Sequence, residues 1–578
     1  MVVGLGVLVF IIALFEFNRK RERNFWEQAF LLIFSAAVVA SFFLSEMRSF
    51  GLSEVLAFLS AVTVYLLFAA RKIEWTDGFL KTVALGGIFA VVIGGILYVT
   101  RGEVRMFGPF FNKLYPGHVW PNAFALFLIM VWPLYVFYLK KRSALEISFI
   151  LGLVFSALLL SFSRGAFLVL CGQLFLLGFY YMGRFKIKTI VAMFLTVVLT
   201  AGFFWGLNEL RLQNHPVIDV AERVGFENYE DLTSKRERLD FWEGAIELTK
   251  ERPFFGWGPF SFRYSYNPIQ KEFLASSDHA HNIFLKISSE NGLIALGAFL
   301  VFLLFWFGTV SARFGKLENE KKDLICILGI SVAGAFAHNM IDYNFNFVAT
   351  LLLLFLFLAF IRSLVVEKED KTRRAYIPLF LAIVVAAVSI YEGVLFTKHF
   401  MGDEAALDKS FFPRYHYLTM ADEALNSGDY DKALLLLEEE TSLSPLSAQA
   451  WYLKGVVYCK EDYAGRDLTL CKKYFGKALQ LNPMNDFNYY HDYFRQLVKE
   501  KSPDIHPVLE EIKPLLENYF FYVEYNVHFT SYTHNVEVAA SLVDAILPYL
   551  SPEETEFFEQ GKEQMLATAA RQRAEKLF

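Results

Sequence analysis

The chain has 578 residues, of which 55% are hydrophobic and 62 are Phe, and its mean hydropathy is +0.36. The net charge of −5 is small and no basic patch stands out, which excludes a nucleic-acid partner. A soluble protein of this length is usually less apolar. The excess indicates repeated segments that cross a bilayer, each of which needs about 20 apolar residues.

Twelve apolar runs predict membrane helices, because only helices satisfy the backbone of such runs in lipid. The first run lacks a basic leader and a cleavage pattern, so it is expected to be retained. The predicted fold is therefore all-α, with a polytopic membrane domain of about twelve helices over residues 1–398. The runs lie at about 1–17, 25–45, 54–70, 79–100, 119–139, 144–161, 164–182, 189–206, 283–309, 324–342, 346–364 and 376–397.

The charge of the connecting loops alternates along the chain. Short loops rich in Lys and Arg are cytoplasmic by the positive-inside rule. The alternate loops then lie outside, including a large one at about 207–282, together with everything after residue 397. Twelve runs also place the N-terminus outside, and an odd number would reverse it. The basic loops are 19–23, 71–72, 140–142, 184–188, 313–322 and 368–374.

Residues 399–578 have a different pattern, which is soluble, amphipathic and helical. Aromatic and small residues recur at a spacing of about 34 residues, as in tetratricopeptide repeats. Stacked repeats of this kind form surfaces that bind peptide or protein, and a structural lid over the membrane domain is the alternative. The first unit holds Tyr417, Ala421, Ala424, Gly428, Tyr430, Ala433 and Pro445, and the second holds Trp451, Gly455, Tyr458, Phe475, Ala478 and Pro483.

Two cysteines fall within the second repeat unit. Cys459 is expected to end one helix and Cys471 to start its partner. A disulfide across this hairpin is plausible in an oxidising compartment. Two free buried thiols are the alternative.

Two predicted outer segments carry arginines. Arg164 lies where two apolar runs meet, and a charge there costs several kcal/mol unless it is paired, solvated or bound to an anion. It is either a snorkelling interfacial residue or a functional one. Arg238 lies in a helical pattern of the large loop, where most charges belong to a solvated face. We favour that interpretation for Arg236 and Arg252.

The large loop meets the next apolar run at residues 277–292, which hold two histidines. His279 and His281 are two residues apart, so only one of them can lie on a given helix face. Asn282 can cap the helix that follows. A metal site is not expected, because the His-x-His pair has no cysteine or carboxylate cluster beside it.

A second polar cluster lies at a predicted short outer turn. It contains His338 and Asp342, between two apolar runs. These residues either cap and join two helices or line the same cavity as the histidines, and we favour lining.

These segments together resemble bacterial O-antigen ligases. His281-Asn282 followed by Gly292 resembles the histidine motif of that superfamily, and Ser163-Arg164-Gly165-Ala166 is similar to its Ser-Arg-Gly element. Arg238-Leu239-x-x-Trp242 with Arg252-Pro253-Phe254-Phe255-Gly256-Trp257-Gly258 resembles its large-loop signature. The superfamily also contains O-antigen polymerases and protein O-oligosaccharyltransferases. The resemblance covers residues 80–365, and Ala295 and the C-terminal repeats depart from the ligase pattern.

The resemblance implies a membrane glycosyltransferase at a bacterial inner or plasma membrane. Such enzymes transfer a glycan from an undecaprenyl-diphosphate carrier to an acceptor hydroxyl outside. The acceptor is a lipid, a polysaccharide or a protein. Arg164 and Arg238 are then expected to bind the diphosphate, since arginine presents a rigid charged fork. No cofactor or metal is expected, because arginines can stabilise the leaving group.

The same resemblance assigns His281 as the general base that takes the acceptor proton, in a direct inverting displacement. His279 is the substitute base, and Asp278 is expected to orient either ring. Asn282, His338 and Asp342 are possible supporting residues.

Two other classes of protein compete with this interpretation. A transporter or flippase for lipid-linked glycans suits twelve spans, but the polar groups gather at one outer face. A non-catalytic scaffold that presents the repeats leaves Arg164, Arg238 and His281 without a purpose. The repeats are expected either to recognise a protein acceptor or to dock to other envelope-assembly proteins, and the sugar, linkage and acceptor stay open.

Overall fold

The computed structural model describes residues 2–19, 21–22, 24–101, 103–111, 118–182, 187–213, 215, 229–273, 277–367, 374–413, 415–525 and 535–574. Within these ranges the protein is all-α. An isolated bridge between Phe111 and Val119 is the one β contact that the described residues make.

Each predicted apolar run coincides with a helix. The third run begins six residues earlier than predicted, at Arg48, and the eighth extends to Leu212. The helices are α1 (Val2–Glu16), α2 (Phe25–Phe43), α3 (Arg48–Phe68), α4 (Thr76–Arg101), α5 (Pro121–Leu139), α6 (Ala144–Leu160), α7 (Arg164–Tyr180), α8 (Ile187–Leu212), α12 (Ile283–Lys286) with α13 (Gly292–Phe314), α14 (Asn319–Asn339), α15 (Val348–Leu364) and α16 (Tyr376–Phe400).

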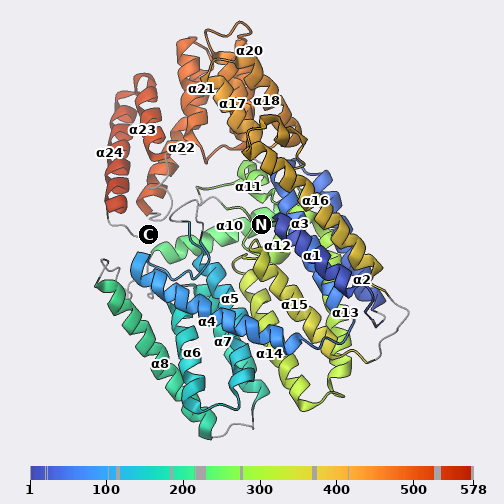
Figure 1. Cartoon of the computed structure of the whole chain (residues 1–578). Coiled ribbons are helices and arrows are strands. Elements are labelled where there is room, and N and C mark those ends of the chain that lie inside the picture. Colours follow the sequence, from blue (N-terminus) through green and yellow to red (C-terminus); the bar gives the residue numbers. More distant parts are fainter. Residues whose placement is uncertain are drawn as a thin grey trace.

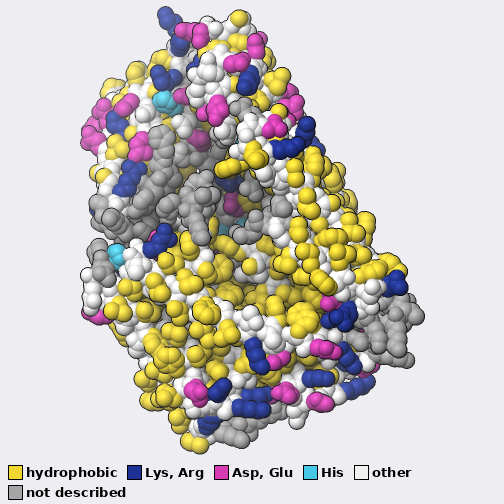
Figure 2. Space-filling view, in the orientation of Figure 1, with side chains coloured by type: hydrophobic (Ala, Val, Ile, Leu, Met, Phe, Trp, Pro, Cys, Tyr) yellow, Lys and Arg dark blue, Asp and Glu magenta, His cyan; other side chains and the backbone are white. Residues whose placement is uncertain are grey.

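Seven helices of the described chain are long and apolar enough to cross a membrane: α2, α3, α4, α5, α8, α12–α13 and α16. Four more, in α1, α6, α7 and α15, are apolar but shorter. Their outer faces expose large apolar side chains, such as Phe194 and Phe175. Figure 2 shows a broad hydrophobic band below a charged upper part. The chain is a multi-pass membrane protein, and the count of twelve spans stays a prediction.

A buried amide joins the helices below the outer surface. The Gln173 side chain of α7 donates to the carbonyls of Ile129 (3.0 Å) and Ile330 (2.9 Å), on α5 and α14. It also accepts from the Trp132 indole at 2.6 Å. Gly334 lets this amide pass, because a Cβ there would overlap the Gln173 side chain. The helices α5, α7 and α14 are thus fixed to one another.

The large loop contains its own helices. The long one is α10 (Tyr229–Glu251), followed by α11 (Phe262–Ser265) and η1 (Asn267–Ile269). In Figure 1, α10 lies across the upper ends of the membrane helices, beneath the C-terminal helices. A π-helix, η2 (Ile287–Asn291), separates α12 from α13.

The C-terminal region is a stack of helical hairpins (Figure 1). Small residues pack where neighbouring helices meet, including Ala424 and Ala433, and a Cβ at Gly455 would lie 3.0 Å from the Phe475 ring. Cys459 and Cys471 form a disulfide between α19 and α20, which decides between the two alternatives that the sequence left open, whereas the tetratricopeptide assignment stays a prediction. The helices are η3 (Glu404–Lys409), α17 (His416–Asn426), α18 (Tyr430–Leu443), α19 (Ala448–Cys459), α20 (Leu468–Leu481), α21 (Phe487–Lys499), α22 (Ile505–Tyr525), α23 (Asn535–Ile546), η4 (Leu547–Tyr549) and α24 (Pro552–Ala574).

The C-terminal helices rest on the start of α3. The Phe50 ring contacts Phe260, Tyr264 and Tyr415, with centroids 4.8–6.1 Å away. Beside it, the hydroxyls of Ser49 and Ser444 are 2.7 Å apart. This contact joins α3, the large loop and the C-terminal helices.

A buried carboxyl at this contact makes the stability pH-dependent. Burial raises the pKa of Glu440 from 4.5 to about 7, although the nearby Ser444 and Ser49 hydroxyls lower it. The folded protein holds this proton more tightly than the unfolded chain, so stability falls as pH rises from 4.5 to about 7. We expect Glu440→Gln to flatten this part of the profile of unfolding temperature against pH.

The exposed neighbour Glu439 provides the control, because Glu439→Gln changes the same charge without burial. Equal pH profiles for wild type and Glu440→Gln would contradict the assignment.

Candidate active site

The centre of the site is a contact between His281 and Asp342. His281 Nδ1 lies 2.7 Å from Asp342 Oδ1, and both side chains are largely buried. His281 precedes α12, whereas Asp342 lies in the turn between α14 and α15. The carboxylate that holds this imidazole is thus that of Asp342, and the expectation that Asp278 orients it is wrong. Asp278 pairs with Arg263 at 3.1 Å instead.

The charge of Asp342 fixes the role of each ring nitrogen. Burial alone raises the pKa of Asp342, but the hydrogen bond from His281 and the electrostatic attraction of His281, His338 and the Arg238 guanidinium outweigh it and lower the pKa far below 3.8. An ionised carboxylate can only accept, so Nδ1 of His281 donates. Nε2 of the neutral ring is then an acceptor. It lies 3.0 Å from the Ser277 hydroxyl, so this nitrogen is within reach of an alcohol.

A second chain of hydrogen bonds reaches Asp342 from the opposite side. Asn122, at the start of α5, donates to Asp342 Oδ2 at 2.6 Å. Its own carbonyl accepts from the Arg105 guanidinium at 2.5 Å, and Arg105 Nε donates to the Ser161 carbonyl at 2.8 Å. Sequence reasoning missed Arg105 and Asn122. The available signal was Arg105, a basic residue in a predicted outer loop, because the positive-inside rule expects most Lys and Arg in cytoplasmic loops.

The two predicted arginines approach the same turn. Arg238 Nε donates to the Ile341 carbonyl at 3.1 Å. A Cβ added to Gly165 would lie 3.7 Å from the Ile341 side chain. Arg164, the first residue of α7, is exposed beside that glycine. The Ser-Arg-Gly element and the large-loop helix thus meet at residue 341.

The other predicted residues surround His281. The His279 ring contacts the rings of His281 and Tyr343, each at 4.9 Å. Burial, and then the charges of His281 and Lys286, lower the pKa of His279 well below 6.5, so this ring is held neutral. His338 is fully buried, and neither of its ring nitrogens is hydrogen-bonded to a described residue.

Asn282 caps α12 as predicted. Its carbonyl accepts from the amides of Phe284 (2.9 Å) and Leu285 (3.2 Å). Its amide donates to the Met340 carbonyl at 3.0 Å. One side chain therefore begins the helix and ties it to the turn that carries Asp342.

Three glycines lock the large-loop signature against the π-helix. Gly256, Gly258 and Gly292 have φ angles of +67°, +110° and +82°. A Cβ at these glycines would overlap Glu290, Ser45 and Phe254 respectively. Backbone bonds join the same segments, from Gly258 N to the Glu290 carbonyl (2.7 Å) and from Leu293 N to the Pro253 carbonyl (2.7 Å). The signature thus has a packing role, which fixes the helix that follows His281.

A buried ion cluster lies under this lock. Lys286 Nζ is 2.9 Å from Glu54 Oε1 and 2.5 Å from Glu290 Oε2. The Phe260 amide donates to both carboxylates, at 3.0 and 2.9 Å. Lys286 is 1% exposed, and a buried charge of this kind needs close partners. The cluster connects α3 to the helix that follows His281.

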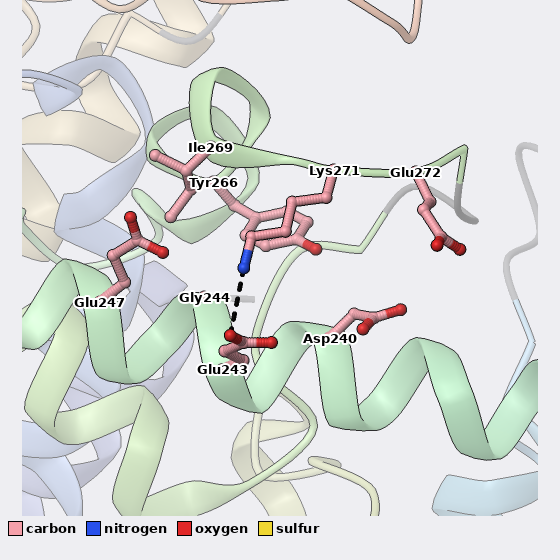
Figure 3. A pocket seen from close by; sticks show the side chains of 8 residues that line it. All are labelled: Asp240, Glu243, Gly244, Glu247, Tyr266, Ile269, Lys271 and Glu272. Atoms are coloured by element: carbon pink, nitrogen blue, oxygen red, sulfur yellow. Dashed lines mark hydrogen bonds and ion pairs between the residues drawn. The ribbon is translucent and has the colours of Figure 1, made fainter.

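A shallow pocket lies on a different face of α10 (Figure 3). In the figure Lys271 reaches toward Glu243, 3.1 Å away, beside the Tyr266 ring. Tyr266 packs closely on Gly244, which leaves no room for a Cβ. Phe241 stacks on His281 at 5.7 Å instead. The pocket thus fixes the loop after α11 onto α10, away from the histidine.

Among the described residues, no cluster of three or more His, Cys, Asp or Glu is arranged to hold a metal ion. His279 and His281 contact each other and aromatic or carboxylate groups, as described above. The chemistry that the geometry supports is proton transfer beside guanidinium groups.

Fold and site together define a multi-pass membrane protein with a basic, histidine-containing site on one face. Residues 147–322 match the family model described as O-Antigen ligase. The match contains Arg164, Arg238 and His281, and it supports the O-antigen ligase superfamily and a membrane enzyme of the glycosyltransferase type. Asp342 and Arg105 lie outside the matched residues. No curated protein matches the chain.

The glycine lock can be tested by stability. Gly258→Ala places a Cβ against Ser45 at φ +110°, so we expect a loss of about 2 kcal/mol or more in the free energy of unfolding. Thermal unfolding in detergent measures it. Gly297→Ala in α13 is the control, because nothing lies within 4 Å of its Cβ position. Equal unfolding temperatures for the two variants would contradict the role of Gly258.

Proposed function

We propose that this protein transfers a glycan from an undecaprenyl-diphosphate carrier to an acceptor hydroxyl on the extracytoplasmic side of the membrane. The observation that carries the proposal is the His281–Asp342 pair beside Arg238. It supplies a proton acceptor next to groups that suit an anionic leaving group. The acceptor is a lipid, a polysaccharide or a protein.

In the proposed reaction, His281 Nε2 takes the proton of the acceptor hydroxyl. The acceptor oxygen attacks the anomeric carbon, and the bond from that carbon to the diphosphate oxygen breaks. One displacement inverts the configuration. The electron pair leaves on the lipid diphosphate, and Asp342 stabilises the imidazolium that forms.

Guanidinium groups are the proposed partners of the diphosphate. Arg238 comes from α10 and Arg164 from the start of α7, where the helix N-terminus also favours an anion. Arg105 is a third cation, tied to Asn122. Fixed cations in a site that excludes water can stabilise a leaving group without a metal ion. We therefore propose a metal-independent reaction.

Two observations support an extracytoplasmic location of this face. The C-terminal helices, which contact the large loop, contain the Cys459–Cys471 disulfide. Disulfides persist in oxidising compartments. The Lys/Arg-rich loops that the positive-inside rule assigns to the cytoplasm join the opposite ends of the membrane helices. We propose a bacterial inner or plasma membrane.

A flippase is less well supported. The close polar contacts of the site gather around the turn at residue 341, at one end of the bundle, and not around a path between helices. A scaffold would not need the Asp342–His281 pair. Neither alternative has an observation of its own that favours it.

The C-terminal helices have a proposed positioning role. Asn485 exchanges hydrogen bonds with Gln270 (2.9 and 3.1 Å) and donates to Asn267 (3.1 Å). Phe273 packs among Phe487, Tyr519 and Tyr522. Four residues after Phe273 the chain reaches Ser277 and the histidine loop. We call these contacts of Asn485 and Phe273 the clasp. The clasp would hold in place the chain that leads to His281.

The first test is glycan transfer by purified protein in nanodiscs, with a lipid-diphosphate-linked glycan, candidate acceptors and a chelator. We expect His281→Ala to lower turnover about 10²–10⁴-fold, the range for a lost general base, and Arg238→Ala and Arg105→Ala to impair transfer as well. His491→Ala is the matched control, because its Nδ1 also contacts an aspartate, Asp492, at 2.9 Å.

Equal transfer by wild type and His281→Ala would remove this residue from catalysis. Transfer that stops with chelator and returns with added metal would contradict the metal-independent scheme.

A second test concerns the clasp. Asn485→Ala removes its bonds to the large loop, and we expect turnover to fall about tenfold, because small displacements of a catalytic group are costly. The KM for the lipid donor should change little. The control is Asn488→Ala, whose side chain bonds to Asp486 within the same domain. Unchanged turnover of a folded Asn485→Ala protein would show that the clasp does not position the site.

A further inference from the structure

A continuous row of aromatic side chains lies on the C-terminal helices. Ring centroids of neighbours along the row are 5.4–6.2 Å apart. Each of these side chains is partly exposed. In order, the row contains Tyr430, Tyr463, Tyr458, Tyr474 and Trp451.

The row runs outward from the membrane domain. Trp451 lies near the start of α19, close to the Ser49–Ser444 contact with α3. Tyr458 lies two helical turns further along α19, a rise of about 10 Å. Tyr463 follows in the loop beyond α19, and Tyr430 begins α18 at the same end. A ligand lying on the row would extend away from the membrane.

Polar groups flank the rings. The Tyr430 hydroxyl donates to Asp462 at 2.7 Å, and the Tyr463 hydroxyl donates to Asp431 at 2.8 Å. Each carboxylate has a second oxygen that can accept from a ligand hydroxyl. The surface therefore combines partly exposed aromatic rings with carboxylate acceptors beside them.

A buried cation supports the membrane-proximal end of the row. Lys454, 2% exposed, lies 4.7 Å from the Trp451 centroid and 5.6 Å from that of Tyr474. It also pairs with Glu438. The two rings are stacked with an interplanar angle of 25°. Their inner side is thus occupied by the domain, and their exposed parts are turned outward.

We infer that this aromatic row is a binding site for a neutral glycan chain. Sugar rings have apolar C–H faces that pack on aromatic rings and hydroxyls at their edges, which match the row and its carboxylates. Tyr and Trp provide such amphipathic contacts. Asp431 and Asp462 disfavour an anionic polymer at the Tyr430 end of the row, and the outward direction suits a chain that grows from the membrane. The choice of glycan as ligand rests on the proposed function.

The test measures binding and needs no transfer. Full-length protein in nanodiscs is titrated with cellohexaose, chitohexaose and mannohexaose, and binding is followed by saturation-transfer NMR. We expect at least one hexasaccharide to bind, and more tightly than its disaccharide. Tyr474→Leu and Tyr463→Leu should each weaken it about tenfold, which corresponds to about 1.4 kcal/mol.

Two controls separate binding at the aromatic row from the loss of an unrelated aromatic ring and from the loss of catalysis. Phe557→Leu removes an exposed aromatic ring on α24 outside the row and should bind normally. His281→Ala should also bind normally, so a failure of transfer and a failure of binding are distinguishable. Circular dichroism and thermal unfolding confirm that the Tyr variants are folded.

Three results would overturn the proposal. The first is that none of the hexasaccharides binds wild type. The second is that the folded Tyr474→Leu and Tyr463→Leu proteins bind as tightly as wild type. The third is that a Ser/Thr-rich peptide binds in a Tyr474-dependent manner while no hexasaccharide does, which would assign the row to a protein partner.

Discussion

The hydrogen bond between His281 and Asp342 is the interaction on which the site depends. It joins two outer segments that are 61 residues apart in sequence. Each partner is held from its own side. Asn282 fixes the histidine segment to the Met340 carbonyl, and Asn122 holds the second oxygen of Asp342. Below them, Gln173 joins α7 to α5, which carries Asn122, and to α14, which leads to the turn with Asp342. An ionised carboxylate so confined determines which nitrogen of the imidazole remains free to accept a proton.

Charges at the end of a membrane bundle are tolerated here because each has close partners. Lys286 contacts two carboxylates, and Arg238 and Arg105 donate to backbone carbonyls. Unpaired charges at this depth would cost several kcal/mol each. Three of the four positive-φ residues other than glycine in the described chain lie in the same segments: Phe162, Phe260 and His281. Such backbone persists when its surroundings enforce it, and at Phe260 the glycine lock and the contact with Phe50 do so.

Local features could be predicted from the sequence, and long-range pairs could not. Apolar runs located the helices, because length and hydropathy act within one segment. Asn282 was recognised as a cap by its position alone, and Cys459 and Cys471 were close enough in sequence to suggest a hairpin. Asp278 was chosen to orient His281 because it is near in sequence, whereas the structure brings Asp342 from another turn. Arg105 and Asn122 were missed, since hydrogen bonds between side chains from three separate segments leave no periodic signal in the sequence.

A double-mutant cycle on His281 and Asp342 tests the central claim most directly. Turnover of wild type, His281→Ala, Asp342→Asn and the double variant is measured in the same nanodiscs, with unfolding temperatures recorded for each. If Asp342 acts through the imidazole, the double variant is no slower than His281→Ala alone, because the carboxylate has nothing left to orient. Losses that multiply in the double variant would show that the two residues act independently and would contradict the account.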